Sequence, residues 1–320
     1  MKHRMKRRMK DVSIGVGLMT LLLTTPARAA GFYVVVAGHV GEPDYEQRFT
    51  TPAKDLDKVL KATGPEAHVY SLIGGEATRV RLTRVLEQVA REAKPDDDFV
   101  LTLIGHGSYD GVEYKFNLVG PDMSAADLAA LCNRIVARRQ LIVNATSASG
   151  GSIPAFQRAG RAVITSTKSG TEKNATVFVR YWVEALQDPS ADVDKNESVS
   201  ALEAFQYADR KTAEFYTSQK RLATEHAVFE DTGKGEAVRA QSPESSEGRL
   251  LASLTLVRFG DAQKAALDPA KRDLLAKKED LERRIDVLKY QKAAMTQNDY
   301  EQQLKALLVE LARVQATLDK

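Results

Sequence analysis

The chain alternates short apolar runs with longer segments in which apolar residues recur every three or four positions. The apolar runs are Phe32–Ala37, Val69–Ile73, Phe99–Ile104, Leu141–Val143 and Arg161–Thr165. Runs of this length between turn residues are typical of strands that are buried on both faces of a parallel sheet. The segments between them carry a helical period, as Val80–Ala93 does. The pattern therefore predicts a three-layer α/β fold with a mainly parallel sheet and right-handed crossovers.

Two further elements are less regular. Gly38–Pro43 breaks the chain after its first strand, and we expect a loop through Tyr45 and Arg48 that leads to a helix from about Pro52, because proline fits a first helical turn. Residues 221–235 end in an acidic, glycine-containing turn, and Glu236–Gly248 is polar and rich in serine. We expect residues 236–260 to be a linker with one possible late strand at Leu250–Phe259.

Two of the predicted strands end in residues that can do chemistry. Phe99–Ile104 leads into Gly105-His106-Gly107, and Leu141–Val143 leads into Thr146-Ser147-Ala148-Ser149-Gly150. Ligands bind at the carboxyl ends of strands in open parallel sheets. A histidine and a hydroxyl group at neighbouring strand ends are placed as a base and a nucleophile need to be.

These paired strand ends carry a resemblance to a known family. A strand ending in His-Gly, followed by one ending in Cys-x-Ser-Gly, resembles the core of legumain-type and caspase-like cysteine peptidases. His106-Gly107 matches the first half, and Ser147-Ala148-Ser149-Gly150 matches the second, with serine where the family has cysteine. The resemblance covers roughly residues 31–235. It implies a six-stranded caspase-like sheet and a polypeptide substrate or protein partner.

By that resemblance, His106 is the general base, Ser147 attacks a carbonyl group, and the N–H groups of Gly107 and Ser147 stabilise the oxyanion. No cofactor is required for this chemistry. A serine needs an aligned base more than a thiol does, since a thiol is partly ionised at neutral pH. The site is therefore either a catalytically degenerate scaffold or a serine-using peptidase or hydrolase, with Thr146 as another candidate nucleophile. Ser147 could also simply cap a helix over residues 154–158.

A second motif gives a third interpretation, a calcium-dependent interaction protein. Within residues 192–203, Asp192, Asp194, Asn196, Ser198 and Glu203 occupy positions 1, 3, 5, 7 and 12 of an EF-hand-like loop, with Ser200 at position 9. Hard cations such as calcium prefer this number of oxygen ligands. Glu197, however, stands where glycine usually makes the sharp turn. The alternative is an acidic N-terminal cap on the following helix, Ser200–Ser218.

The first 29 residues have the layout of a secretory signal peptide. A basic run, Lys2–Lys10, precedes an apolar stretch that is too short to span a bilayer comfortably, and Ala27-Arg28-Ala29 follows with small residues at cleavage spacing. This segment carries a net charge of +6, whereas the whole chain carries +3. The remainder of the chain therefore has a net charge of −3. We therefore expect a periplasmic or secreted protein with no membrane span after cleavage, and no nucleic-acid partner.

The last segment, residues 261–320, is different in kind. Leucines recur every seventh residue from Leu267 to Leu288, and a second apolar seam runs from Tyr300 to Leu318. Thr296–Asp299 interrupts them with capping residues, which predicts an antiparallel helical hairpin. The hairpin either folds back on the domain or forms a coiled coil that supports a homodimer. The single cysteine, Cys132, lies on the apolar face of a predicted helix at Ala125–Ile135, so we expect a packed thiol.

Overall fold

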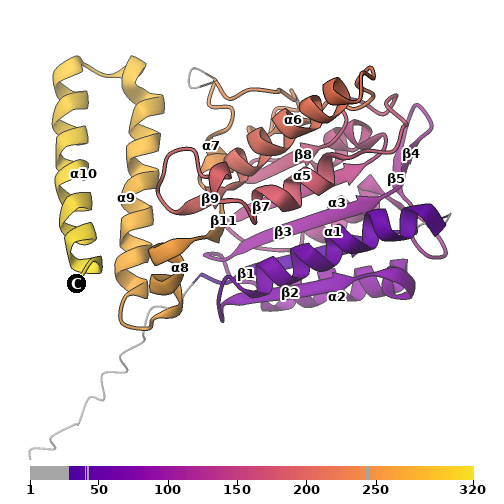
Figure 1. Ribbon diagram of the computed structural model, residues 1–320, viewed down its shortest axis with the longest axis horizontal. Coiled ribbons are helices and arrows are strands. Elements are labelled where there is room, and N and C mark those ends of the chain that lie inside the picture. The colour runs from indigo at the N-terminus through magenta and orange to yellow at the C-terminus, as the bar shows by residue number, and fades with distance from the viewer. Residues whose placement is uncertain (1–28, 40, 42, 243–244) are drawn as a thin grey trace, which may run out of the picture.

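The computed structural model describes the chain from residue 29 onward, apart from residues 40, 42, 243 and 244. The expected signal peptide therefore lies outside the described residues, except for its last position. A six-stranded sheet forms the centre of the molecule (Figure 1). Its strands, in spatial order, are β10 (Val228–Glu230), β8 (Arg161–Thr165), β7 (Arg139–Thr146), β3 (Asp98–Gly105), β1 (Gly31–Ala37) and β2 (Ala67–Leu72). All neighbours are parallel except β10 and β8, so the predicted mainly parallel sheet is confirmed.

Helices cover both faces of this sheet. On one face lie α1 (Pro43–Lys61), α5 (Phe178–Ala185) and α6 (Ala201–Ser218), and on the other lie α2 (Arg79–Glu92) and α3 (Ala125–Cys132). Strand β1 is apolar throughout because alternate side chains enter the two cores: Val35 packs on the first face and Val34 on the second. The three-layer prediction is confirmed.

Helix α1 begins earlier than the sequence suggested. It starts at Pro43, and Pro52 lies inside it, so Tyr45 and Arg48 are helical and the expected loop is wrong. An interior proline removes one helical hydrogen bond and costs about 3 kcal/mol. Burial of the helix face formed by Phe49, Ala53, Leu56 and Leu60 offsets that cost.

The late strand is also in a different place. The segment around Thr255–Arg258 is strand β11, but it pairs antiparallel with β9 (Ser198–Ser200) in a small separate sheet. The sixth strand of the central sheet is β10, which the sequence analysis did not predict as a strand. Its three residues are all buried, and so short a segment carries almost no periodic signal. A third sheet contains β4 (Gly107–Tyr109), β5 (Tyr114–Phe116) and β6 (Met123–Ser124).

Short elements complete the domain. They are η1 (Gly74–Glu76), η2 (Ser149–Ser152), α4 (Ile153–Phe156), η3 (Pro189–Ala191) and α7 (Arg249–Ala252). Residues 236–260 are more than a linker, because Leu251, Leu254, Leu256 and Val257 are buried in the core under α6 and β9. Among the described residues, no helix is long and apolar enough to span a membrane.

The C-terminal helical pair is confirmed. After α8 (Gly260–Leu267), helix α9 (Arg272–Gln291) and helix α10 (Gln297–Leu318) run antiparallel, joined through η4 (Lys292–Ala294). Thr296 caps α10 by accepting a hydrogen bond from the Asp299 N–H at 3.2 Å. Leu281, Ile285, Leu288, Leu307 and Val314 form the buried seam. Leu267, at the end of α8, is half exposed and does not belong to this buried seam.

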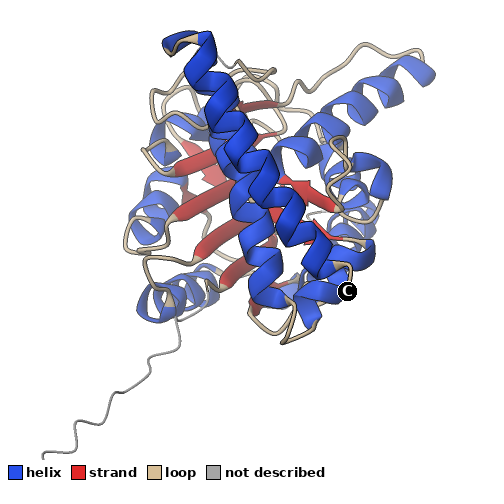
Figure 2. Ribbon diagram, turned by 90° about the vertical axis from the view of Figure 1, so that its left-hand side faces the viewer, coloured by secondary structure: helices blue, strands red, loops and turns tan. Residues whose placement is uncertain are grey.

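Helix α9 packs on the domain, and α10 packs on α9 from outside (Figures 1 and 2). Arg258 on β11 forms two hydrogen bonds with Glu279 on α9, at 2.5 and 2.9 Å. Lys278 donates to the carbonyl oxygen of Asn196 at 3.2 Å. The hairpin therefore folds back on the domain and stands at the edge where β3 and β7 begin.

Candidate functional site

The strand register brings the two predicted site residues together at the opposite edge. Strands β3 and β7 pair from Asp98 and Arg139 through to Gly105 and Thr146. His106 and Ser147 are the next residue on each strand, so they leave the sheet side by side from strands that lie about 5 Å apart. The register therefore brings the ends of both strands to the same edge of the sheet.

Ser147 is buried and is bonded to the backbone of Gly107. Its Oγ accepts a hydrogen bond from the Gly107 N–H at 3.2 Å and donates to the Gly107 carbonyl oxygen at 3.0 Å. A side chain on Gly107 would lie 2.5 Å from the Ser147 carbonyl oxygen, so only glycine allows this approach. The same N–H group is the expected oxyanion donor, and here the serine hydroxyl occupies it.

The helix-cap interpretation of Ser147 is wrong. Ala148, in the left-handed region with φ 55°, precedes η2, and Ser152 precedes α4, each without a side-chain capping bond. The hydroxyl of Ser147 turns toward β4 instead, because the left-handed turn at Ala148 redirects the chain immediately after the strand.

Thr146 lies below the site in a buried hydroxyl network. Its Oγ1 is 2.6 Å from the Tyr114 hydroxyl group and donates to Asn144 Oδ1 at 2.8 Å. Asn144 in turn donates to Ser152 Oγ at 3.0 Å. Since Thr146 is fully buried, it positions the end of β7 and is not placed to attack a substrate.

His106 packs against two neighbouring aromatic rings of α1. Its imidazole ring meets the Tyr45 ring edge-to-face at 4.7 Å and the Phe49 ring at 5.0 Å, measured between ring centroids. Tyr45 and Phe49 are four residues apart on α1 and therefore share one helical face, so both rings can contact the imidazole. Asp110 does not reach the imidazole: its Oδ1 accepts hydrogen bonds from the N–H groups of Val112 and Glu113 within its own turn.

Tyr109 is a site residue that the sequence analysis missed. Its ring packs between Gly151, after β7, and Gly170, after β8. A side-chain carbon on Gly151 would lie 2.7 Å from this ring, and one on Gly170 would overlap it. The Tyr109 hydroxyl group donates to the Gly111 carbonyl oxygen at 3.0 Å. Gly151 and Gly170, on the loops after β7 and β8, thus receive a ring of the protein itself.

Two acidic residues join the loops around this edge. Glu172 Oε1 lies 2.5 Å from His226 Nδ1, and the Glu172 carbonyl oxygen accepts the Ala148 N–H at 2.7 Å. Glu225 is almost fully buried, and burial raises its pKa to about 7 against three hydrogen bonds that lower it. The hydrogen-bond contact with Glu172 gives His226 a structural role. His39, at the end of β1, is exposed.

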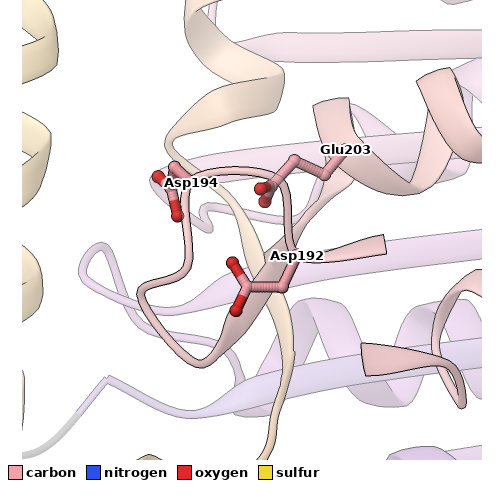
Figure 3. A group of neighbouring side chains, drawn as sticks. All are labelled: Asp192, Asp194 and Glu203. Carbon is pink, nitrogen blue, oxygen red and sulfur yellow. The ribbon is translucent and has the colours of Figure 1, made fainter. Parts of the chain in front are cut away.

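The EF-hand-like loop brings three carboxylates together. One oxygen each from Asp192, Asp194 and Glu203 lies within 4.8 Å of the others, at the turn that leads into α6 (Figure 3). Asn196 and Ser198 face each other inside the loop, with Asn196 Oδ1 accepting from the Ser198 hydroxyl group at 2.5 Å. Burial, followed by the negative charges of Glu203 and Asp192, raises the pKa of Asp194 to about 6. The clustered carboxylates therefore repel one another.

Glu197 makes the sharp turn in place of glycine. Its backbone has φ 67°, the left-handed conformation that this position of the loop requires. Its carboxylate accepts the Ala262 N–H at 2.8 Å and so caps α8, which explains how a strained non-glycine residue is held there. The predicted helix cap is also confirmed: Ser200 and Glu203 form a capping box at the start of α6.

The loop faces helix α9 across a cavity of about 320 Å³. Glu282 on α9 lines this cavity, and burial together with the nearby charge of Asp194 raises its pKa to about 7. Lys195 donates to the Asp192 carbonyl oxygen at 2.7 Å. The domain loop and the hairpin thus share one electrostatic environment.

Comparison with known proteins gives structural similarity alone. No family model and no curated protein sequence matches the chain. Among solved structures, protein GSU0716 from Geobacter sulfurreducens is 13% identical with a TM-score of 0.46, over 72% of this chain and 100% of its own. The Drosophila initiator caspase Dronc is 12% identical with a TM-score of 0.42, over 68% of this chain and 84% of its own.

A caspase-1 from Spodoptera frugiperda gives similar values. It is 12% identical with a TM-score of 0.42, over 64% of this chain and 87% of its own. Identities this low do not transfer residue roles from those proteins to this chain.

Proposed function

We propose that this protein is an exported, catalytically degenerate relative of the caspase and legumain peptidases, and that it serves as a scaffold for a polypeptide partner. The observation that carries this proposal is the bond between the Ser147 hydroxyl group and the Gly107 backbone. A nucleophilic serine must give its proton to a base at the moment of attack. Here that proton is donated to a carbonyl oxygen, and the expected oxyanion donor is engaged by the same hydroxyl group.

The position of Tyr109 supports the same conclusion. Its ring fills the space between Gly151 and Gly170 on two loops near Ser147, and we infer that an extended substrate would displace this ring. Displacement exposes an aromatic ring and breaks the Tyr109–Gly111 hydrogen bond. A polypeptide partner is therefore expected to bind the outer rim of this edge rather than the catalytic position.

The decisive experiment is labelling of the mature protein with a fluorophosphonate, followed by mass spectrometry of the Ser147 peptide. A scaffold gives no adduct, while an active serine hydrolase in the same tube is fully labelled. An adduct on Ser147 that disappears in His106→Ala would establish the alternative, a serine-using peptidase with a His106–Ser147 dyad. An adduct that persists in His106→Ala would also contradict an inert site.

A second candidate function is calcium-dependent interaction through residues 192–203. The specific observation in its favour is the convergence of three carboxylates on a loop whose sixth position has the left-handed turn. Asp192, Asp194, Asn196, Ser198 and Glu203 are the proposed ligands, and calcium would remove the mutual repulsion of the carboxylates.

Calcium binding is tested by the melting temperature of chelator-treated protein. Calcium added at 100 times its dissociation constant should stabilise the fold by about 2.7 kcal/mol. Asp192→Asn should abolish this shift, whereas Asp209→Asn, an acidic residue outside the loop, should keep it. Equal shifts with calcium in both variants would exclude the loop as the site.

A further inference from the structure

A large cavity lies between one face of α9 and the domain, at the opposite edge from His106 and Ser147. It has a volume of about 670 Å³. Its walls come from the start of β7, the turn after β10, the residues around α7, and one face of α9. This volume lies within the roughly 300–1,000 Å³ that is typical of small-molecule sites, which often form between structural units.

Cationic side chains dominate the cavity. Two of them are neutralised: Arg139 pairs with Asp98 at 2.5 Å, and Arg283 pairs with Asp280 at 3.1 Å. Four others are exposed and have no ion pair with any carboxylate in the described part of the chain: Arg138, Lys234, Arg249 and Arg284. Side chains from four separate segments thus present unpaired positive charge to one space.

The carboxylates of the cavity do not balance these cations. Asp280 is paired with Arg283, and Asp286 with Lys289 at 2.8 Å. Asp231 accepts hydrogen bonds from the N–H groups of Gly248 at 3.0 Å and Leu250 at 2.9 Å, so both of its oxygens are engaged with the backbone. Among the lining residues that the structure describes, one buried carboxylate therefore stands against four unpaired cations, and these residues attract anions.

The cavity also has an apolar part. Leu250, Val287 and Tyr290 line it, and all three are half buried. Burial raises the pKa of Tyr290, and the charges of Asp231 and Asp286 raise it further, so its phenol remains a hydrogen-bond donor at neutral pH. A planar or apolar body fits against this ring while charged groups reach the cations at the rim.

We propose that this cavity binds a small organic polyanion. The anionic groups lie between Arg284 of α9 and Arg138 and Arg249 of the domain, with Lys234 at the rim, and the apolar body packs on Tyr290. Because the ligand contacts both the hairpin and the domain, its binding also fixes the hairpin in place. The proposal does not depend on the state of Ser147.

Isothermal titration calorimetry with three probes tests this proposal on the full mature chain in the presence of a chelator. ATP combines a planar body with phosphates, tripolyphosphate has only the charge, and adenosine has only the body. We expect ATP to bind more tightly than tripolyphosphate and adenosine to give no signal. No binding of ATP and tripolyphosphate at millimolar concentration, or binding of adenosine as tight as that of ATP, would overturn the proposal.

Charge reversals locate the site. Arg249→Glu/Arg284→Glu should weaken ATP binding about tenfold or more, since two charge-assisted contacts are lost. Arg91→Glu/Lys305→Glu has the same net charge and changes exposed residues on α2 and α10, so it should bind ATP as the parent does. Equal weakening in both variants would indicate a general charge effect and contradict a built site.

A third variant tests the apolar part. Tyr290→Ala should weaken ATP binding and leave tripolyphosphate binding unchanged. If ATP binding and tripolyphosphate binding weakened by the same factor, or if neither weakened, the assigned role of the ring would be contradicted. Circular dichroism of each variant confirms that the fold is retained.

Discussion

The hydroxyl group of Ser147 lies against the backbone of Gly107, accepting its N–H at 3.2 Å and donating to its carbonyl oxygen at 3.0 Å. This pair of bonds ties the end of β7 to the start of β4. The residue that the family resemblance marks as nucleophile therefore has a structural role in this chain.

Ser147→Ala should lower the free energy of unfolding by about 1–2 kcal/mol, because it removes both bonds and leaves backbone groups without their partner. Ser108→Ala, an exposed residue of β4, is the matched control and should change nothing. Urea denaturation measures both. Equal stability of the two variants would mean that the Ser147–Gly107 bonds contribute nothing to the fold.

Gly170→Ala should destabilise the protein by about 1–3 kcal/mol, because the added methyl group overlaps the Tyr109 ring. Tyr109→Ala/Gly170→Ala should recover part of this loss, since the space is then free. A double-mutant cycle from thermal denaturation gives the coupling energy. Strict additivity of the two substitutions would show that the ring does not occupy the slot between the glycines.

Stability should fall as the pH rises from about 5 to 8, and Glu225 should contribute to that fall. Burial raises the pKa of this carboxyl to about 7, above its unfolded value near 4.3. Between these values the native state binds more protons than the unfolded state, so the free energy of unfolding decreases with pH. Glu282, whose pKa is also about 7, acts in the same direction.

Glu225→Gln should therefore flatten this dependence, whatever its effect on stability at a single pH. The measurement is the urea midpoint at pH 5 and at pH 8. Glu236→Gln, which changes an exposed carboxylate, should keep the slope of the parent. A parental slope in Glu225→Gln would exclude this carboxyl as a source.

Cys132 should not react with Ellman's reagent at pH 8 until the protein unfolds. The thiol is fully buried, and burial raises its pKa to about 11. Ser108→Cys supplies an exposed thiol in the same chain as a control for the reagent. We expect one thiol equivalent to react fast, from the introduced cysteine, and a second equivalent to react only in guanidinium chloride, from Cys132. Two fast equivalents would contradict the packing of Cys132.

Arg161 is buried and has no carboxylate partner in the part of the chain that the structure describes, and burial lowers its pKa to about 10. Gln140 Oε1 accepts from its Nε at 2.9 Å and its Nη2 at 2.7 Å. Gln140→Leu should lower the free energy of unfolding by about 3 kcal/mol, because it leaves a buried cation unsatisfied. Gln140→Glu keeps an acceptor and should cost less. The reverse order, measured by urea denaturation, would be inconsistent with this contact.

The layers of this fold, and the two strand ends that meet at the candidate site, follow from local patterns in the sequence. Apolar runs and helical periods are local signals, and the rule that parallel strands present their carboxyl ends together makes His106 and Ser147 neighbours. The helix seam and the Thr296 cap of the hairpin were also local, so they could be predicted.

The contacts of those residues depend instead on how distant segments pack together. Tyr109 enters a slot formed by glycines 42 and 61 residues further along the chain, and the Ser147 hydroxyl group bonds to a residue 40 positions away. The same holds for β10, which is too short to signal itself, and for the cavity between Arg138 and Arg284, whose cations come from distant segments. Packing joins positions that no period in the sequence relates, and so it decided the state of the site.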